Sequence, residues 1–444
     1  MSKKEPRDKI DPDTPNTSEG AESTTVNRKT SLSSEAEHVF KKRCSWLDHT
    51  IANAKINESE FRGVFRLILV LFIFFVARHL YILFFSNIPG KSGLIVRVLK
   101  DLQYLFIIWP LFHVWSYSAY FLQLLILKGI PRWIAIIIQH TTQSGIFLFT
   151  TLICLYGDMC TTHNCFTCFQ CIIHFFKMHS YTEVNRSYRE EMLLCKKTGG
   201  KPSSSYPDNI TFSNFYYFCK VPTFIYQENY PKSNSAVEWS YIIKKFFMSA
   251  FLLLFIYYVY TEYVEIYIKI ILDVGIIEMI TVIAIPIFMI IIGGFYLVFE
   301  QVLPAYAELT KFEDRLFYDD WWNSTNMEEF FRKWNRLVHQ FLYKHFYLHC
   351  IKEYGWRKDT SKLFTFFFSA LLHEYCIAMV LKIFRPILSI LMMFQIPLMV
   401  ISAKFWKNHK SFGNCFFWFS IIFGNAFVFI LYNKEYIKIY GLDS

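Results

Sequence analysis

Apolar runs of about 20 residues recur along this chain, from about residue 63 to about residue 432. Each run is long enough to cross roughly 30 Å of hydrocarbon as a helix. A single soluble core would not need this repetition, so we predict an all-α, polytopic membrane protein. We expect about nine spans from the runs at residues 64–86, 103–127, 132–156, 163–178 (a shorter helix), 240–261, 264–303, 337–352, 361–384, 387–404 and 413–432.

The chain divides into three regions by composition. Residues 1–38 are rich in Ser, Thr, Lys, Asp and Glu, and we expect a disordered cytosolic tail because they cannot bury enough apolar surface to fold. Residues 39–62 carry spaced apolar side chains, which predict an amphipathic segment before the first span. Residues 63–444 form the membrane domain. Within it, we expect breaks in the run at 264–303 at Asp273 and Gly275, and also at Gly293 and Gly294.

The net charge of +10 is interpreted as Lys and Arg on cytoplasmic loops, as is usual in membrane proteins. Charge alone does not separate this reading from a polyanionic soluble substrate. We expect membrane lipids around the protein and no nucleic-acid partner.

Four of the eleven cysteines are clustered, at Cys160, Cys165, Cys168 and Cys171. The spacing is typical of metal ligands. On a helix, however, steps of three residues drift by about 60° each, so the thiols would not converge. We therefore favour packed, buried cysteines and predict no metal. A disulfide between Cys160 and Cys165 is the other possibility.

A basic segment at residues 332–339 reads RKWNRLVH. On a continuous helix, Arg332, Asn335, Arg336 and His339 would share one face. Guanidinium groups bond phosphate oxygens well, so such a face would suit a phosphorylated carrier, with Lys333 adding charge. The plainer alternative is a solvated, positively charged loop.

Just upstream, residues 317–323 read FYDDWWN. Asp319 and Asp320 are placed to cap the following helix or to pair with nearby arginines. The two tryptophans, Trp321 and Trp322, and Asn323 are equally compatible with interface anchors and with the wall of a ligand tunnel.

His373 lies inside an apolar run, residues 363–384, that is long enough to span a bilayer. Ionisable residues within such runs are costly and mark functional sites. A neutral imidazole there would serve as a general base; the alternative is a hydrogen-bonded core histidine. Ser369 lies on the same helical face. Glu374 points elsewhere and is expected to be structural, paired with a Lys or Arg.

FYDDWWN, then RKWN, then S-x-x-x-HEY together resemble the membrane-bound O-acyltransferases, and in particular their sterol and diacylglycerol branch. The stretch VPTFIYQENYP at residues 221–231 extends this resemblance. It implies a helical bundle with an intramembrane reaction chamber, over residues 63–444. It also implies transfer of an acyl group from long-chain acyl-CoA, the co-substrate, to a lipid hydroxyl in the endoplasmic reticulum membrane, by a homo-oligomer without a cofactor.

The resemblance also implies roles for individual residues. His373 matches the family's catalytic base, and Asn335 matches its second polar active-site residue. We expect the acyl-CoA path to be lined by Arg332, Trp334, Ser369, Trp321, Asn323 and Tyr318, with the phosphates near Arg332, Lys333 and Arg336.

Three segments resemble the sterol branch: KRCSWLDHT (42–50), HSYTEVNR (179–186) and FGNAFVFILYNKEY (423–436). We therefore expect a sterol taken from the bilayer as acceptor. Diacylglycerol is the alternative acceptor. A transporter or a non-catalytic sterol-binding protein is the alternative of another class. A transporter would tend to show internal repeats, and none stands out.

Overall fold

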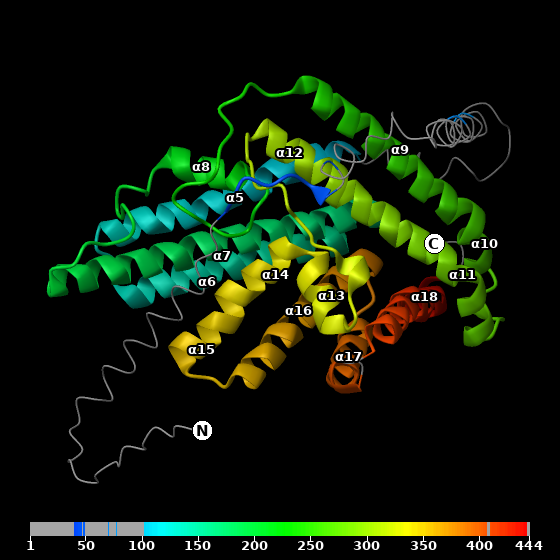
Figure 1. The fold of residues 1–444 in the computed structure, drawn as a ribbon. Helices are drawn as coiled ribbons and strands as arrows, with labels where there is room; N and C mark the ends of the chain where they lie inside the picture. The colour runs from blue at the N-terminus through cyan, green and yellow to red at the C-terminus, as the bar shows by residue number, and fades with distance from the viewer. Residues whose placement is uncertain are drawn as a thin grey trace, which may run out of the picture.

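The computed structural model describes residues 40–46, 48, 70, 77, 102–405 and 409–441, and this part of the chain is helical (Figure 1). It contains no β-strand, only the isolated bridges Arg43–Asp314 and Lys232–Phe312. The all-α prediction is therefore confirmed. The predicted tail at 1–38, most of the segment 39–62 and the predicted span at 64–86 lie outside the described residues.

The long helices carry most of the structure. In chain order they are α5 (Leu102–Leu127), α6 (Arg132–Tyr156), α7 (Thr161–Thr198), α9 (Trp239–Tyr263), α11 (Ile276–Tyr296), α16 (Lys358–Leu381), α17 (Ile387–Phe405) and α18 (Lys410–Tyr440). Between them lie the short helices α8 (Phe212–Lys220), α10 (Glu265–Ile268), α12 (Leu303–Leu309), α13 (Met327–Trp334), α14 (Arg336–Leu342) and α15 (Leu348–Tyr354). A 3₁₀ turn, η3 (Trp321–Asn323), and two π-helical segments, η2 (Leu297–Val302) and η4 (Tyr343–Tyr347), complete the list.

Five helices in the described part are long and apolar enough to cross a membrane, which supports the multi-pass prediction. They are Leu102–Leu127, Trp239–Ile268, Ile276–Leu309, Lys358–Leu381 and Lys410–Tyr440, with Ile387–Ile401 as a shorter apolar helix. The expected number of about nine spans stays a prediction. The short helix expected at 163–178 is wrong, because α7 continues for 38 residues. A polar helix can extend in this way when tertiary packing supports it.

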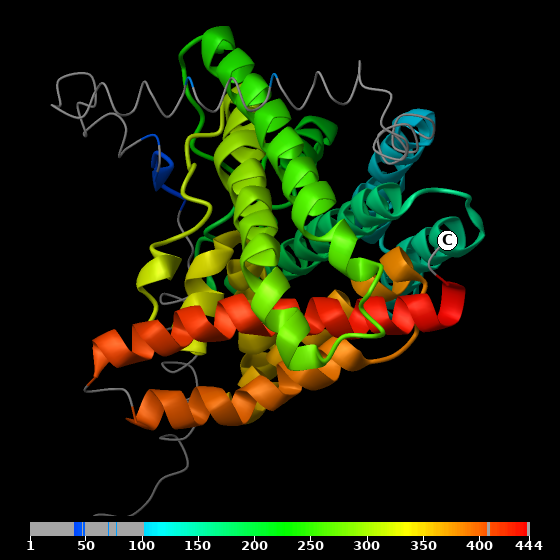
Figure 2. The ribbon, with the colours of Figure 1, turned by 90° about the vertical axis from the view of Figure 1, so that its right-hand side faces the viewer.

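The helices form two groups around the segments between α12 and α15 (Figure 1). In one group α5, α6 and α7 pack on one another, and α16 packs on α7. In the other group α9 and α11 lie side by side. Figure 2 shows α18 crossing α11, with α17 beside α18. The polar segments singled out in the sequence therefore lie where the two groups meet.

Two breaks are expected in the run at 264–303, which forms α10, α11, η2 and α12, and only one of them is present. Gly275 does precede α11, but the break expected at Gly293 and Gly294 is wrong. A Cβ at Gly293 would lie 3.0 Å from Ile256 Cγ1, so this glycine allows α11 to approach α9 closely. The distortion comes one turn later, in the π-helical segment η2. Such π-bulges within α-helices are frequently found at functional sites.

Candidate active site

The cassette, residues 317–323, is held in an aromatic core. Trp321 is 3% exposed, and its ring centroid lies 5.3 Å from that of Phe295, 4.7 Å from that of Trp334 and 5.7 Å from that of Trp418. Aromatic pairs at these distances add to the free energy gained by burying their area. Trp321 is therefore part of the core. Its indole nitrogen is buried without a hydrogen-bond partner in the described residues.

Helix α18 fastens the end of the cassette. The side-chain amide of Asn414 donates to the carbonyl oxygens of Trp322 and Ser324 at 2.9 and 2.8 Å. The preceding residue, Gly413, lies so close that an added Cβ would be 2.6 Å from the Thr325 carbonyl oxygen. Only glycine fits at this point, because any side chain would collide with the backbone.

The acidic residues of the cassette bind two of the basic residues that follow. Asp319 pairs with Arg336 at 2.8 Å, and Lys333 pairs with Asp320 at 3.0 Å and with Glu329 at 2.7 Å. Partial burial raises the pKa of Asp320, but the hydrogen bond and charge of Lys333 outweigh it and leave that pKa below its usual value. These charges stabilise one another locally.

Arg332 differs from Lys333 and Arg336. Its side chain is exposed and has no ion-pair partner within the described residues. Lys333 and Arg336 already have carboxylate partners, and the expectation that all three cations face a phosphorylated carrier stays a prediction. Arg332 remains available.

The predicted continuous helical face from Arg332 to His339 is also wrong. The backbone leaves the helical region at Asn335, with φ −139° and ψ 88°, so α13 ends and α14 begins there. Asn335 caps α14 by accepting the backbone N–H of Val338 at 3.2 Å through its side-chain oxygen. Its amide nitrogen makes no hydrogen bond within the described residues and can donate.

His373 sits on α16 with its ring exposed. Nδ1 lies 2.7 Å from the backbone carbonyl oxygen of Ser369. A carbonyl oxygen can only accept, so Nδ1 carries the proton and donates it in this bond. In the neutral ring, Nε2 then has the free lone pair that a general base requires.

The two residues after His373 point into the protein. Glu374 accepts the Tyr432 hydroxyl at 2.6 Å and the Ser389 backbone N–H at 2.7 Å. Tyr375 donates to the Phe147 carbonyl oxygen at 3.0 Å. The structural role predicted for Glu374 is confirmed, although its partners are a tyrosine and a backbone amide, and neither is the expected cation.

Packing brings α13 and α14 against α16. The rings of Phe331 and Phe366 lie 5.5 Å apart, which joins α13 to α16. One cluster of apolar side chains includes Val338 of α14 and Leu372 of α16. Asn335 and His373 thus lie on neighbouring, packed segments. Asn323 and Arg332 are exposed, whereas Tyr318 and Trp321 are buried.

One functional candidate escaped the sequence analysis. Glu300, in η2, is fully buried and accepts the hydroxyl of Tyr318 at 2.5 Å. An acidic residue inside an apolar run was the available signal.

Of the four clustered cysteines, Cys168 and Cys171 are buried, and Cys160 and Cys165 are partly buried. All eleven are free thiols, so the possible Cys160–Cys165 disulfide is absent. Cys154, Cys168 and Cys376 share one buried cluster between α6, α7 and α16. Across the part of the chain that the structure describes, no three His, Cys, Asp or Glu side chains are placed to hold a metal ion. That the reaction needs no metal stays a prediction.

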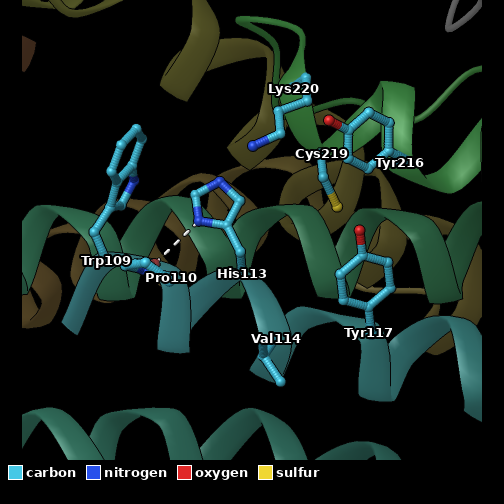
Figure 3. A pocket seen from close by; sticks show the side chains of 8 residues that line it. All are labelled: Trp109, Pro110, His113, Val114, Tyr117, Tyr216, Cys219 and Lys220. Atoms are coloured by element: carbon cyan, nitrogen blue, oxygen red, sulfur yellow. Dashed lines mark hydrogen bonds between the residues drawn. The ribbon is translucent and has the colours of Figure 1, made fainter. Parts of the chain in front are cut away.

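A pocket of about 300 Å³ lies between α5 and α8 (Figure 3). It is lined by Trp109, Pro110, His113, Val114, Tyr117, Tyr216, Cys219 and Lys220. None of them is a predicted site residue. We place the candidate site at α13–α14 and α16, because the exposed His373 imidazole and the Asn335 amide lie there on packed segments.

The fold and this site define a multi-pass membrane protein with an exposed imidazole on an apolar helix. Comparison with known proteins gives the family. Residues 134–433 match the membrane-bound O-acyltransferase family, so the chain belongs to it.

The individual relatives fall into two groups. Sterol O-acyltransferase 2 of Candida albicans is 34% identical over 51% of this chain and 39% of its own length. Sterol O-acyltransferase 2 of Saccharomyces cerevisiae is 33% identical over 52% of this chain and 38% of its own length. Diacylglycerol O-acyltransferase 1 of Bos taurus is 29% identical over 89% of this chain and 85% of its own length. The match thus spans about two fifths of the two sterol O-acyltransferases.

Proposed function

We propose that this protein transfers a long-chain acyl group from acyl-CoA to the 3-hydroxyl of a sterol in the endoplasmic reticulum membrane. The observation that carries the proposal is the His373 imidazole, whose Nδ1 is held by a carbonyl so that Nε2 is the base. Family membership supplies the reaction class.

In the proposed reaction, Nε2 of His373 removes the proton from the sterol hydroxyl as its oxygen attacks the thioester carbonyl. The tetrahedral intermediate then expels the CoA sulfur, which takes the proton from the imidazolium. The products are a sterol ester and CoA. No covalent enzyme intermediate forms, so His373 ends each cycle neutral.

The neighbouring residues have complementary roles in this proposal. The Asn335 amide nitrogen, which is free to donate, would bond the thioester oxygen as negative charge develops on it. Arg332, exposed and unpaired within the described residues, would bind a CoA phosphate. The unpartnered, buried indole N–H of Trp321 would gain a partner in bound acyl-CoA, because buried donors without partners are rare.

Two observations bear on the acceptor. Local identity is 33–34% to the sterol enzymes of Candida albicans and Saccharomyces cerevisiae and 29–32% to the bovine and human diacylglycerol enzymes, a small difference that favours a sterol. Coverage favours the other reading, because the bovine diacylglycerol enzyme matches 89% of this chain. Diacylglycerol is therefore the second candidate acceptor. We further expect a homo-oligomer, as the resemblance implies.

The test is acyl transfer in membranes from cells that lack their own sterol and diacylglycerol acyltransferases. Membranes with wild type, His373→Ala or the control His140→Ala receive labelled oleoyl-CoA and either cholesterol or diacylglycerol. His140 is a matched control because it is an exposed histidine on another long helix, α6.

Sterol ester formed by wild type and by the control, but lost in His373→Ala, is the expected result. Triacylglycerol would move the proposal to the second acceptor. No transfer to either lipid from folded protein would overturn the proposed function.

A further inference from the structure

The segment before the first predicted span, residues 40–46, is attached to the chain just ahead of the cassette; we refer to it as the brace (Figure 1, blue). The Arg43 backbone N–H donates to the Glu313 carbonyl oxygen at 3.0 Å, and its own carbonyl accepts the Arg315 N–H at 2.9 Å. Its guanidinium binds both carboxylate oxygens of Asp314, at 2.9 and 2.5 Å. This bidentate geometry fixes orientation as well as position.

Apolar contacts secure the start of the brace. Phe40 is buried, and its ring centroid lies 5.6 Å from those of Tyr230 and Phe312. Burial of a phenylalanine side chain is among the larger single contributions to docking of a short segment. The brace is therefore anchored on both sides of Arg43.

The end of the brace reaches the cassette through a buried carboxylate. Ser45, 1% exposed, donates its hydroxyl to one oxygen of Glu300 at 3.1 Å. Tyr318, within the cassette, donates to the other oxygen at 2.5 Å. A buried carboxylate oxygen that loses its donor is costly, so each hydroxyl supports the other through Glu300.

A second contact is direct. The ring of Trp46 meets that of Trp322 edge to face, with centroids 5.9 Å apart. Beyond Trp46, Asp48 accepts the Lys245 ammonium at 3.1 Å, and the same ammonium donates to the Glu300 carbonyl oxygen at 2.8 Å. The brace, the π-helical segment η2 and the cassette are thus joined by hydrogen bonds and ring contacts.

We propose that Ser45 and Trp46 are positioning residues that, through Glu300 and Trp322, hold the cassette in the geometry that binds acyl-CoA. The inference rests on the proposed function for its ligand. It extends the active site to a segment about 270 residues earlier in the chain, as the Arg43–Asp314 separation of 271 shows.

The first experiment measures kinetics of Ser45→Ala and Trp46→Ala, with Lys42→Ala as the matched control. Lys42 lies in the brace, but its side chain is exposed and pairs with Glu313 at the surface, and pairs of this kind contribute little. We expect the KM for oleoyl-CoA to rise about fivefold to tenfold in the two variants, because a buried hydrogen bond or ring contact is lost. The kcat and the KM for the acceptor lipid should change less than about twofold, and Trp46→Phe should restore most of the affinity.

A purely structural brace would give another pattern. The amount of folded protein would fall, while the KM of the remaining protein for oleoyl-CoA stayed at the wild-type value. That outcome would overturn the proposal.

The second experiment keeps the test informative if single variants misfold. Arg43→Asp and Asp314→Arg are made singly and together, so that the double variant restores opposite charges at the bidentate contact. We expect each single variant to raise the KM for oleoyl-CoA and the double variant to recover at least half of the loss on a logarithmic scale. Single variants whose KM matches that of wild type would also overturn the proposal.

A readout without turnover separates this inference from the proposed function. Trypsin cleaves after basic residues, and Arg43 is the last basic residue of the brace. The signal is therefore the rate of cleavage after Arg43 in membranes, which is followed by the masses of the released peptides. We expect cleavage after Arg43 to be slow in wild type and fast in Ser45→Asp, whose carboxylate repels Glu300. Slow cleavage in a wild-type protein that transfers no acyl group would mean that residues 40–46 are docked but that the proposed function is wrong. Fast cleavage in wild type would mean that these residues are not docked, and it would overturn this inference.

Discussion

The cassette and the His373 segment of α16 are both polar stretches in an apolar chain, yet they are packed in opposite ways. In the cassette, Trp321 is in the core, and Asp319 and Asp320 are paired with cations. On α16, Glu374 and Tyr375 are tied to other helices, while His373 is exposed and keeps Nε2 available. The difference teaches that conspicuous residues need not be available to a ligand: most of the cassette is packed or paired, whereas α16 presents the imidazole that we propose as the base.

The largest expected effect is on activity, and it should separate the adjacent residues His373 and Glu374. His373→Ala should lower kcat by about 10²- to 10⁴-fold, the usual contribution of a general base. Its melting temperature should match that of wild type, because the ring is exposed. Glu374→Ala should instead lower the melting temperature, since two donors lose their acceptor. Thermal melting of both purified variants, beside the transfer assay, checks the pair. An unstable His373→Ala protein would break the comparison.

The cassette should respond to truncation through stability. Trp321→Ala should lower the free energy of unfolding by about 3–5 kcal/mol, as for other buried tryptophans. Thermal melting in detergent measures the effect, and Trp133→Ala, an exposed tryptophan on α6, is the control. A stable but inactive Trp321→Ala protein would show that Trp321 serves the ligand more than the core.

A smaller effect separates two arginines of one segment. Arg332→Ala should raise the KM for oleoyl-CoA about tenfold, corresponding to one lost charge-assisted hydrogen bond. Arg336→Ala should mainly lower stability, because Asp319 loses its partner. Steady-state kinetics and melting of both variants distinguish the roles. If Arg332→Ala and Arg336→Ala raised the KM for oleoyl-CoA equally, Arg336 would have to release Asp319 and bind oleoyl-CoA.

The smallest effect concerns acid. Although partial burial raises the pKa values of Asp320 and Glu329, Lys333 lowers both below their ordinary range. Groups with lowered pKa values stabilise the fold above their unfolded pKa and lose that contribution as pH falls through the folded one. The melting temperature of wild type should therefore fall more steeply between about pH 5 and pH 3 than that of Lys333→Met. Parallel slopes in the two proteins would contradict the assignment.

Some of the site could be predicted from local pattern. His373 stood out because an ionisable residue inside an apolar run needs a reason. The structural role of Glu374 followed from helical periodicity, which places it on another face. The helical face from Arg332 to His339 could not be predicted, because the same periodicity assumes an unbroken helix. The break at Asn335 depends on the cassette, whose Phe317 carbonyl accepts the Arg336 N–H at 3.1 Å.

The sequence by itself determined the class of protein: long apolar runs require helices in a membrane, since backbone groups there must be satisfied within the segment. It also singled out the candidate site residues, through their types and their family pattern. Only the tertiary structure decided which of them are available. Whether Arg332 or Arg336 is paired, and that Ser45 reaches Glu300, depend on contacts between residues that are separated in the chain. Local pattern carries no record of such contacts, because they form only when the helices pack.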